Sequence, residues 1–104
     1  MIHIEYDSVE NYYKRLVFDH IISEFGDTEI AQSPGAIEDI ACLALNQLPP
    51  RYVRHAIDTA FYITLEEQRE MIGAVQAAVA RAAEFVAKNP REPLSEVLPK
   101  HLPE

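Results

Sequence analysis

The sequence has a single cysteine, only three glycines and no long hydrophobic run. One cysteine, Cys42, cannot form a disulfide within the chain or build a cysteine zinc cluster, which agrees with a reducing compartment. The scarcity of glycine excludes long flexible linkers. No stretch approaches the roughly 20 apolar residues that a membrane-spanning helix needs, and the start of the chain carries acid where a secretory signal carries base. We therefore expect a cytoplasmic protein with no membrane association.

Positive charge is also scarce, because 9 Lys and Arg stand against 17 Asp and Glu and give a net charge of −8. Binding to duplex DNA depends on many phosphate contacts from basic side chains, so we expect no direct DNA binding. A ligand with only two phosphates is a different case, since a local cluster of roughly two to four cations can hold it on an otherwise acidic surface. The position of each cation therefore matters more than the total.

The overall composition is that of an ordinary globular protein. Hydrophobic residues make up 48% and charged residues 25% of the 104 residues, enough for one core but not for two. We find no internal repeat and no low-complexity run. We assign residues 1–92 to a single helical domain and residues 93–104 to a C-terminal tail.

Helical periodicity predicts three main helices and therefore an all-α fold. The first helix is expected over residues 9–25, where apolar residues recur at helical intervals. Asp7 has capping-box spacing with Glu10, and Ser8 is an alternative N-cap. Residues 2–6 alternate between apolar and polar side chains, which indicates a short extended arm ahead of this helix.

The second helix is expected to start at Ser33-Pro34-Gly35, with serine as the cap and proline in the first turn. It carries apolar residues as far as Leu48, and Pro49-Pro50 then ends it because proline cannot continue a helix. Its short, apolar sequence predicts a central place in the core. Cys42 has apolar neighbours on both sides, so we expect it to be a small core residue.

The third helix is expected to begin at the capping box Thr64-Leu65-Glu66-Glu67 and to reach Lys88, before Asn89-Pro90 ends it. This is about 25 residues, or ~37 Å at a rise of about 1.5 Å per residue. Apolar residues on a heptad seam, and others beside it, make a wider face than one short neighbour can cover. The seam contains Leu65, Ile72, Val75, Val79, Ala82 and Val86, and Met71, Ala74, Ala78 and Phe85 widen it. A second copy of the chain would cover the surplus, so we expect a helical homodimer.

The segment after Pro49-Pro50 is the strongest candidate for a binding site. The double proline fixes the backbone just before Arg51, Tyr52 and Arg54, so two guanidinium groups and an aromatic ring are presented at low entropic cost. Arginine chelates phosphate or the O6/N7 edge of guanine, and tyrosine or arginine stacks on a purine. The alternative is that the prolines end a helix, Tyr52 covers the edge of the core and the arginines are solvated.

Lys14 and Arg15, beside Tyr12 and Tyr13, form a second basic and aromatic candidate. The alternative is that the tyrosines are half-buried and that the two cations are surface residues with partly covered stems.

Metal and enzyme chemistry find little support in the sequence. The four histidines show no metal-ligand spacing, so we predict neither a metal nor a cofactor. No Ser, Cys or Thr lies in a recognisable catalytic arrangement, and the sequence has no phosphate loop or dinucleotide-binding fingerprint. These absences argue against an enzyme.

Three stretches of the sequence are typical of one known family. They are the Asn11-Tyr12-Tyr13 start of the first helix, the block Ala44-Leu45-Asn46-Gln47-Leu48-Pro49-Pro50-Arg51-Tyr52-Val53, and the closing Asn89-Pro90-Arg91. Together they resemble the late-competence ComFB family over roughly residues 9–91. The resemblance implies an all-helical homodimer. It also implies a non-enzymatic bacterial receptor for cyclic dinucleotides, namely cyclic di-GMP and in some members cyclic di-AMP, linked to competence, motility or cell-size control.

The resemblance further implies roles for residues at matching positions. Asn46 is expected to be an amide donor or acceptor, Arg51 and Arg54 to bind phosphate or guanine, and Tyr52 to stack on a base or to orient the ligand. Lys14 and Arg15 are further candidate cations for the ligand. The signal is expected to pass to a downstream protein that the sequence does not identify. Some relatives carry a cysteine-rich zinc site, which this chain, with only Cys42, does not match.

Two alternatives stay open beside the receptor. The first is a ligand-free dimeric adaptor, in which the same helices serve only dimerisation and protein contact. The second is an enzyme acting on the dinucleotide.

Overall fold

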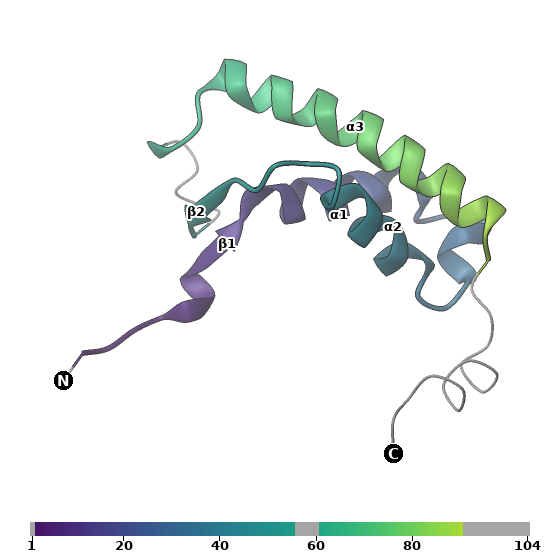
Figure 1. Ribbon diagram of the computed structural model, residues 1–104, viewed down its shortest axis with the longest axis horizontal. Helices are drawn as coiled ribbons and strands as arrows, with labels where there is room; N and C mark the ends of the chain where they lie inside the picture. The colour runs from purple at the N-terminus through teal and green to yellow at the C-terminus, as the bar shows by residue number, and fades with distance from the viewer. Residues whose placement is uncertain (1, 56–60, 91–104) are drawn as a thin grey trace.

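Three helices dominate the computed structural model, which describes residues 2–55 and 61–90 (Figure 1). The helices are α1 (Tyr12–Phe25), α2 (Ala36–Leu45) and α3 (Leu65–Lys88). α3 lies along one side of the molecule, above α1 and α2 in the view of Figure 1. Two short 3-10 turns, Tyr6–Ser8 and Glu29–Gln32, precede the first strand and α2 respectively. The three predicted helices are therefore confirmed, and the proposed tail at 93–104 lies outside the described residues.

A small antiparallel sheet corrects the all-α prediction. β1 (Val9–Asn11) pairs with β2 (Tyr52–Arg54). The facing residues are Val9 and Arg54, Glu10 and Val53, and Asn11 and Tyr52. Residues 9–11, predicted as the start of the first helix, pair their backbone groups with β2 instead. Strands of three residues are too short to show a period of two, so helical periodicity alone could not reveal them.

α1 begins at Tyr12, later than predicted, because Asn11 caps it. The Asn11 Oδ1 atom accepts a hydrogen bond from the Tyr13 N–H at 3.2 Å. The predicted caps do not act on this helix: Asp7 and Ser8 lie in the preceding 3-10 turn, where the Ser8 hydroxyl donates to the Glu5 carbonyl at 2.9 Å. Because residues 9–11 belong to β1, the helix begins only after Asn11, the last residue of the strand.

α2 begins after Gly35 and ends earlier than predicted, at Leu45. Gly35 has a φ of +78°, a left-handed conformation that glycine adopts without steric cost. Beyond the helix, the Gln47 side chain forms hydrogen bonds with α3. Its Nε2 donates to the Ala78 carbonyl at 3.3 Å, and its Oε1 accepts from the Arg81 Nε at 2.6 Å. These bonds fix the path of the chain into Pro49-Pro50 and β2.

The hydrophobic core lies between the three helices, and α2 is central to it as predicted. Fully buried side chains come from every helix: Val17 and Ile21 from α1, Ile40 and Ala44 from α2, and Ala78 from α3. Cys42 corrects the prediction, because it is exposed. It follows buried Ala41 by one residue, and one residue rotates a side chain by about 100° around a helix, out of the core.

α3 begins after Thr64 and ends at Lys88, as predicted. The predicted heptad seam is buried only in its central part, where Val75 and Val79 pack into the core. Leu65 and Ile72, toward the start of the helix, are 74% and 42% exposed. Among the helices of residues 2–55 and 61–90, none is long and apolar enough to cross a membrane.

Candidate functional site

β2 presents Tyr52 and Arg54 on one face and Val53 on the other. Tyr52 is 64% exposed, Val53 is 2% exposed, and Arg54 is exposed. Alternation is the rule for a strand, so a buried Val53 directs both of its neighbours outward. No residue of the described chain forms a hydrogen bond or ion pair with the Arg54 side chain. Within that part of the chain, the strand therefore carries an aromatic ring and an unengaged guanidinium group on the same outer face.

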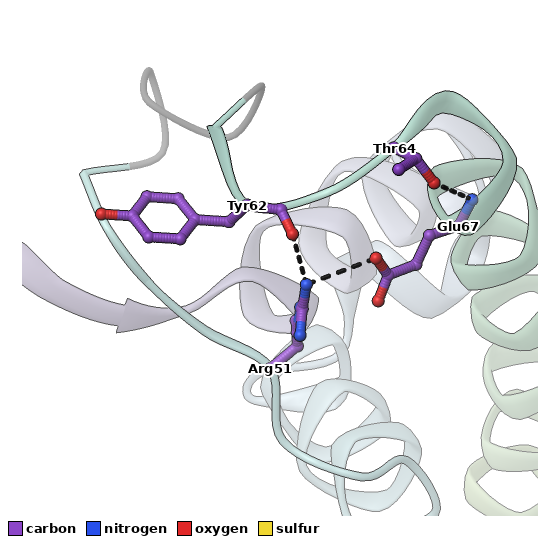
Figure 2. Close-up of polar contacts among 4 residues, drawn as sticks. All are labelled: Arg51, Tyr62, Thr64 and Glu67. Atoms are coloured by element: carbon purple, nitrogen blue, oxygen red, sulfur yellow. Dashed lines mark hydrogen bonds and ion pairs between the residues drawn. The ribbon is translucent and has the colours of Figure 1, made fainter.

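The Arg51 side chain joins β2 to the start of α3 (Figure 2). Its Nη2 donates to the backbone carbonyl of Tyr62 and lies 3.3 Å from the Glu67 Oε1. The Arg51 and Glu67 side chains are 38% and 39% exposed, so solvent reaches the pair. Arg51 was predicted to be a ligand-binding cation; here its guanidinium group already has an internal carboxylate partner.

The Arg51 backbone is held on both sides by the junction of β1 and α1. Its N–H donates to the Asn11 Oδ1 at 2.9 Å, and its carbonyl accepts from the Tyr12 N–H at 2.8 Å. Asn11 therefore has two tasks, because the same oxygen also caps α1. The Arg51 Nε is buried and has no hydrogen-bond partner within the described chain. The backbone is thus fixed while the guanidinium group retains unused donors.

The Thr64-Leu65-Glu66-Glu67 capping box is only half formed. The Thr64 Oγ1 accepts from the Glu67 N–H at 3.1 Å, as predicted for the N-cap of α3. In a complete box the Glu67 carboxylate would accept from the Thr64 N–H. Within residues 61–90 that bond is not made, and the carboxylate contacts Arg51 instead (Figure 2).

Tyr13 lies in the same electrostatic environment. Burial raises the pKa of its phenol, the Glu67 carboxylate raises this pKa further, and the Arg51 guanidinium opposes the rise. The Glu70 carboxylate adds a smaller upward effect on the pKa. Tyr12 and Tyr13 are both buried, more deeply than the half-buried state expected from the sequence. The two rings therefore belong to the core rather than to a ligand-stacking surface.

Asn46 is exposed at the C-terminal end of α2, where its backbone N–H donates to the Cys42 carbonyl at 3.1 Å. Its side chain has no hydrogen-bond partner in the part of the chain that the structure describes. The amide is thus accessible, and the chain passes from it through the double proline to Arg51.

Lys14 and Arg15 are exposed on α1 and line a surface hollow. Three carboxylates, from Asp7, Glu10 and Asp19, line the same hollow. These acids offset the two cations, so this second basic patch is electrostatically weak. No hydrogen bond or ion pair among the described residues links it to Arg51 or Arg54.

Three residues with a part in the site were missed from the sequence. Asn11 had a usable signal, since asparagine directly before a helical pattern is a favoured N-cap. Glu67 was recognised as part of a capping box, but not as a partner of Arg51. Tyr62 contributes a backbone carbonyl, which any residue would offer, so no sequence signal could have identified it. Among the described residues, no group of three or more His, Cys, Asp or Glu side chains is placed to hold a metal ion.

The family model for the late competence development protein ComFB matches residues 10–90. This range contains all three helices, β2 and every candidate binding residue. No curated protein matches the chain.

Proposed function

Because the chain belongs to the ComFB family, we propose that it is a non-enzymatic receptor that binds a cyclic dinucleotide on the outer face of β2 and signals through contacts with another protein. Family membership itself indicates a role in late competence development, and this is not a known enzyme family. The observation that carries the proposal is the placement of Tyr52 and Arg54 together on one exposed face.

The two side chains match the two chemical parts of such a ligand. A tyrosine ring stacks on a purine, and base–aromatic stacking tolerates any base. A guanidinium group binds a phosphate, or the O6/N7 edge of guanine, through two parallel hydrogen bonds. Pairing with β1 holds both positions in place, so little entropy is lost on binding. Asn46 is the proposed amide contact, and Arg51, Lys14 and Arg15 are the proposed additional cations.

The acidic surface does not prevent this binding. At physiological ionic strength, charges in water are screened beyond about 8 Å, so the net charge of −8 acts weakly on a ligand already close to Arg54. In this proposal the protein is a homodimer. A cyclic dinucleotide with two identical halves has the two-fold symmetry of such a dimer, and cyclic di-GMP is the first choice, with cyclic di-AMP second.

Isothermal titration calorimetry against cyclic di-GMP, with cyclic di-AMP and GMP as comparisons, tests the proposal. We expect saturable binding at micromolar or tighter affinity and little binding of GMP. Arg54→Ala should weaken binding roughly 10- to 100-fold, because a hydrogen bond to a charged group contributes about 1.5–3 kcal/mol. Tyr52→Ala should weaken it by a similar factor, since stacking contributes about 1–3 kcal/mol per base.

Lys88→Ala is the matched control, because it also removes one positive charge but lies at the far end of α3 from β2 (Figure 1). It should leave the affinity unchanged. Arg51→Ala is harder to interpret, since it also removes the contacts to Tyr62 and Glu67. A flat titration with both dinucleotides at high protein concentration would contradict the receptor proposal.

A ligand-free dimeric adaptor is the second candidate function. The observation that favours it is a run of exposed apolar side chains ahead of α1, contributed by Ile2, Ile4, Tyr6 and Val9. Exposed apolar groups in one region are typical of protein–protein contact sites. An adaptor of this kind predicts that cyclic dinucleotides change neither the melting temperature of the protein nor its affinity for a partner.

A further inference from the structure

The Glu67 carboxylate has two competing partners at the start of α3. As the last residue of the capping box, it is placed to accept a hydrogen bond from the Thr64 N–H. Its Oε1 lies instead 3.3 Å from the Arg51 Nη2, and the Thr64 bond is not made within the described segment 61–90 (Figure 2). The structure therefore shows one of two arrangements that this carboxylate can adopt.

The contact between Arg51 and Glu67 is a weak one. At 3.3 Å it is longer than a strong charge-assisted bond, it uses a single guanidinium nitrogen, and both side chains are more than a third exposed. Exposed ion pairs of this kind contribute little stability. Arg51 also has a buried Nε without a hydrogen-bond partner among the described residues. A phosphate offers two oxygens to a guanidinium group, so it can form two parallel hydrogen bonds where Glu67 forms one.

We propose that Glu67 is an exchangeable counter-ion of Arg51. An anionic phosphate bound beside β2 takes Arg51 from Glu67, and the released carboxylate closes the capping box on the Thr64 N–H. This inference rests on the function proposed above and deepens it, since it names the residue that lowers the affinity of the free site and carries the effect of the ligand to α3.

The exchange explains two properties that the site needs. An anion competes with the carboxylate for Arg51 better than a neutral molecule does, so Glu67 favours anionic ligands. Release of Glu67 leaves no charge without a partner, because the Thr64 N–H and the positive end of the α3 dipole receive it. The ligand therefore favours one of two states of the helix start, which is the condition for a binding event to alter contacts elsewhere.

Titration of cyclic di-GMP into the wild-type protein, Glu67→Gln and Glu66→Gln tests the exchange. Glu66 is the matched control, because it is exposed in the same first turn and the change in net charge is identical. We expect Glu67→Gln to bind about two- to five-fold more tightly than Glu66→Gln, the range that corresponds to an exposed ion pair. Equal affinities of the two variants would overturn the exchange while leaving the receptor proposal intact.

Hydrogen exchange at the Thr64 amide, followed by NMR, gives a second readout that can be made on the wild type. There, cyclic di-GMP should slow this exchange as Glu67 closes the box. In Glu67→Gln the ligand should have no such effect, because the uncharged amide of this variant does not pair with Arg51 in the free protein. If cyclic di-GMP binds the wild-type protein but leaves hydrogen exchange at the Thr64 amide unchanged, the proposed counter-ion role is also overturned. If neither the wild type nor Glu67→Gln binds the ligand, the receptor function itself fails, and the inference falls with it.

Discussion

Arg51 combines a fixed backbone with an incompletely paired side chain. Asn11 and Tyr12 hold its N–H and its carbonyl, whereas one guanidinium nitrogen serves both Tyr62 and Glu67. A buried N–H without a partner costs free energy in the folded protein, so the Arg51 Nε lowers the net stability that this side chain contributes. A substitution at Arg51 therefore alters the fold as well as the proposed binding site, and its effect on affinity cannot be assigned to ligand contact alone.

Tyr13 gives a prediction for alkaline pH. Burial and the nearby Glu67 carboxylate raise its pKa, so the folded protein favours the neutral phenol. The stability that follows is fully present below about pH 10, the ordinary pKa of tyrosine, and is lost as the pH rises through the higher folded value. Tyr13→Phe, which cannot ionise, should therefore lose less folding free energy than the wild type as the pH rises above about 10.

Urea unfolding followed by circular dichroism at several pH values measures this difference. Tyr6→Phe is the control, because the Tyr6 ring is exposed and stays in water whether the chain is folded or unfolded. It should show the same alkaline loss as the wild type. A Tyr13→Phe protein with the wild-type dependence on pH would contradict the assigned role of burial.

At the scale of the elements, the junction between β1 and α1 holds the segment of residues 51–54, which carries the proposed binding side chains. The last residue of the strand is the cap of the helix, and its oxygen also holds the chain that enters β2. One side chain thereby couples the start of α1 to the position of Arg51. The sheet is short, with three residues in each strand, so this coupling contributes much of what keeps β2 in place.

Asn11→Ala should therefore destabilise the protein more than the loss of an ordinary cap. We expect about 1.5–3 kcal/mol, because the variant loses an N-cap bond and also leaves the Arg51 N–H without its acceptor. Thr64→Ala, which removes one cap bond from α3, should cost about 1 kcal/mol. Asn11→Asp keeps the acceptor oxygen and should therefore retain most of the wild-type folding free energy. Urea unfolding curves give the three values, and equal costs for Asn11→Ala and Thr64→Ala would refute the double role.

The sequence predicted the helices well and the sheet poorly, for a physical reason. Helices of 14 and 24 residues repeat their apolar pattern over several turns, and Pro49-Pro50 and Thr64 mark ends that depend on local chemistry. β1 and β2 are held by partners about 40 residues away, which no local pattern reveals. Tyr52 and Arg54 could be identified as candidates because proline precedes them. The ion pair between Arg51 and Glu67 could not be identified from the sequence, because it depends on how α3 packs against the rest of the chain.

At the scale of the whole molecule, apolar surface on α3 agrees with the expected homodimer. Leu65 and Ile72 are exposed and seven residues apart, which places them on one face of the helix. Phe85 was expected to widen this apolar face, but it lies on a different side of the helix from Leu65 and Ile72, although it is also exposed. The expected dimer uses the face of Leu65 and Ile72, and its existence stays a prediction, as do the cytoplasmic location and the downstream partner.

A double variant, Leu65→Ser with Ile72→Ser, tests this face by sedimentation velocity. Each apolar side chain buried in a two-fold interface counts twice, and full burial of one contributes about 1.5–3 kcal/mol. We expect the wild type to be a dimer and the double variant to dissociate at least about 100-fold more readily. Phe85→Ser should leave the dimer intact. A monomeric wild type at high concentration, or a double variant that dimerises normally, would rule out this interface.

The pairing of β1 with β2 also determines when the proposed binding face can form during synthesis. Asn11 can bond to Arg51 only after 40 further residues have been made, and Arg51 contacts Tyr62 and Glu67, 11 and 16 residues beyond it. Contacts across such separations form only after the intervening chain has closed into a loop. A growing chain released before Glu67 therefore has the residues of β1 and α1 but no complete site. The proposed site is therefore complete only when the first turn of α3 has left the ribosome.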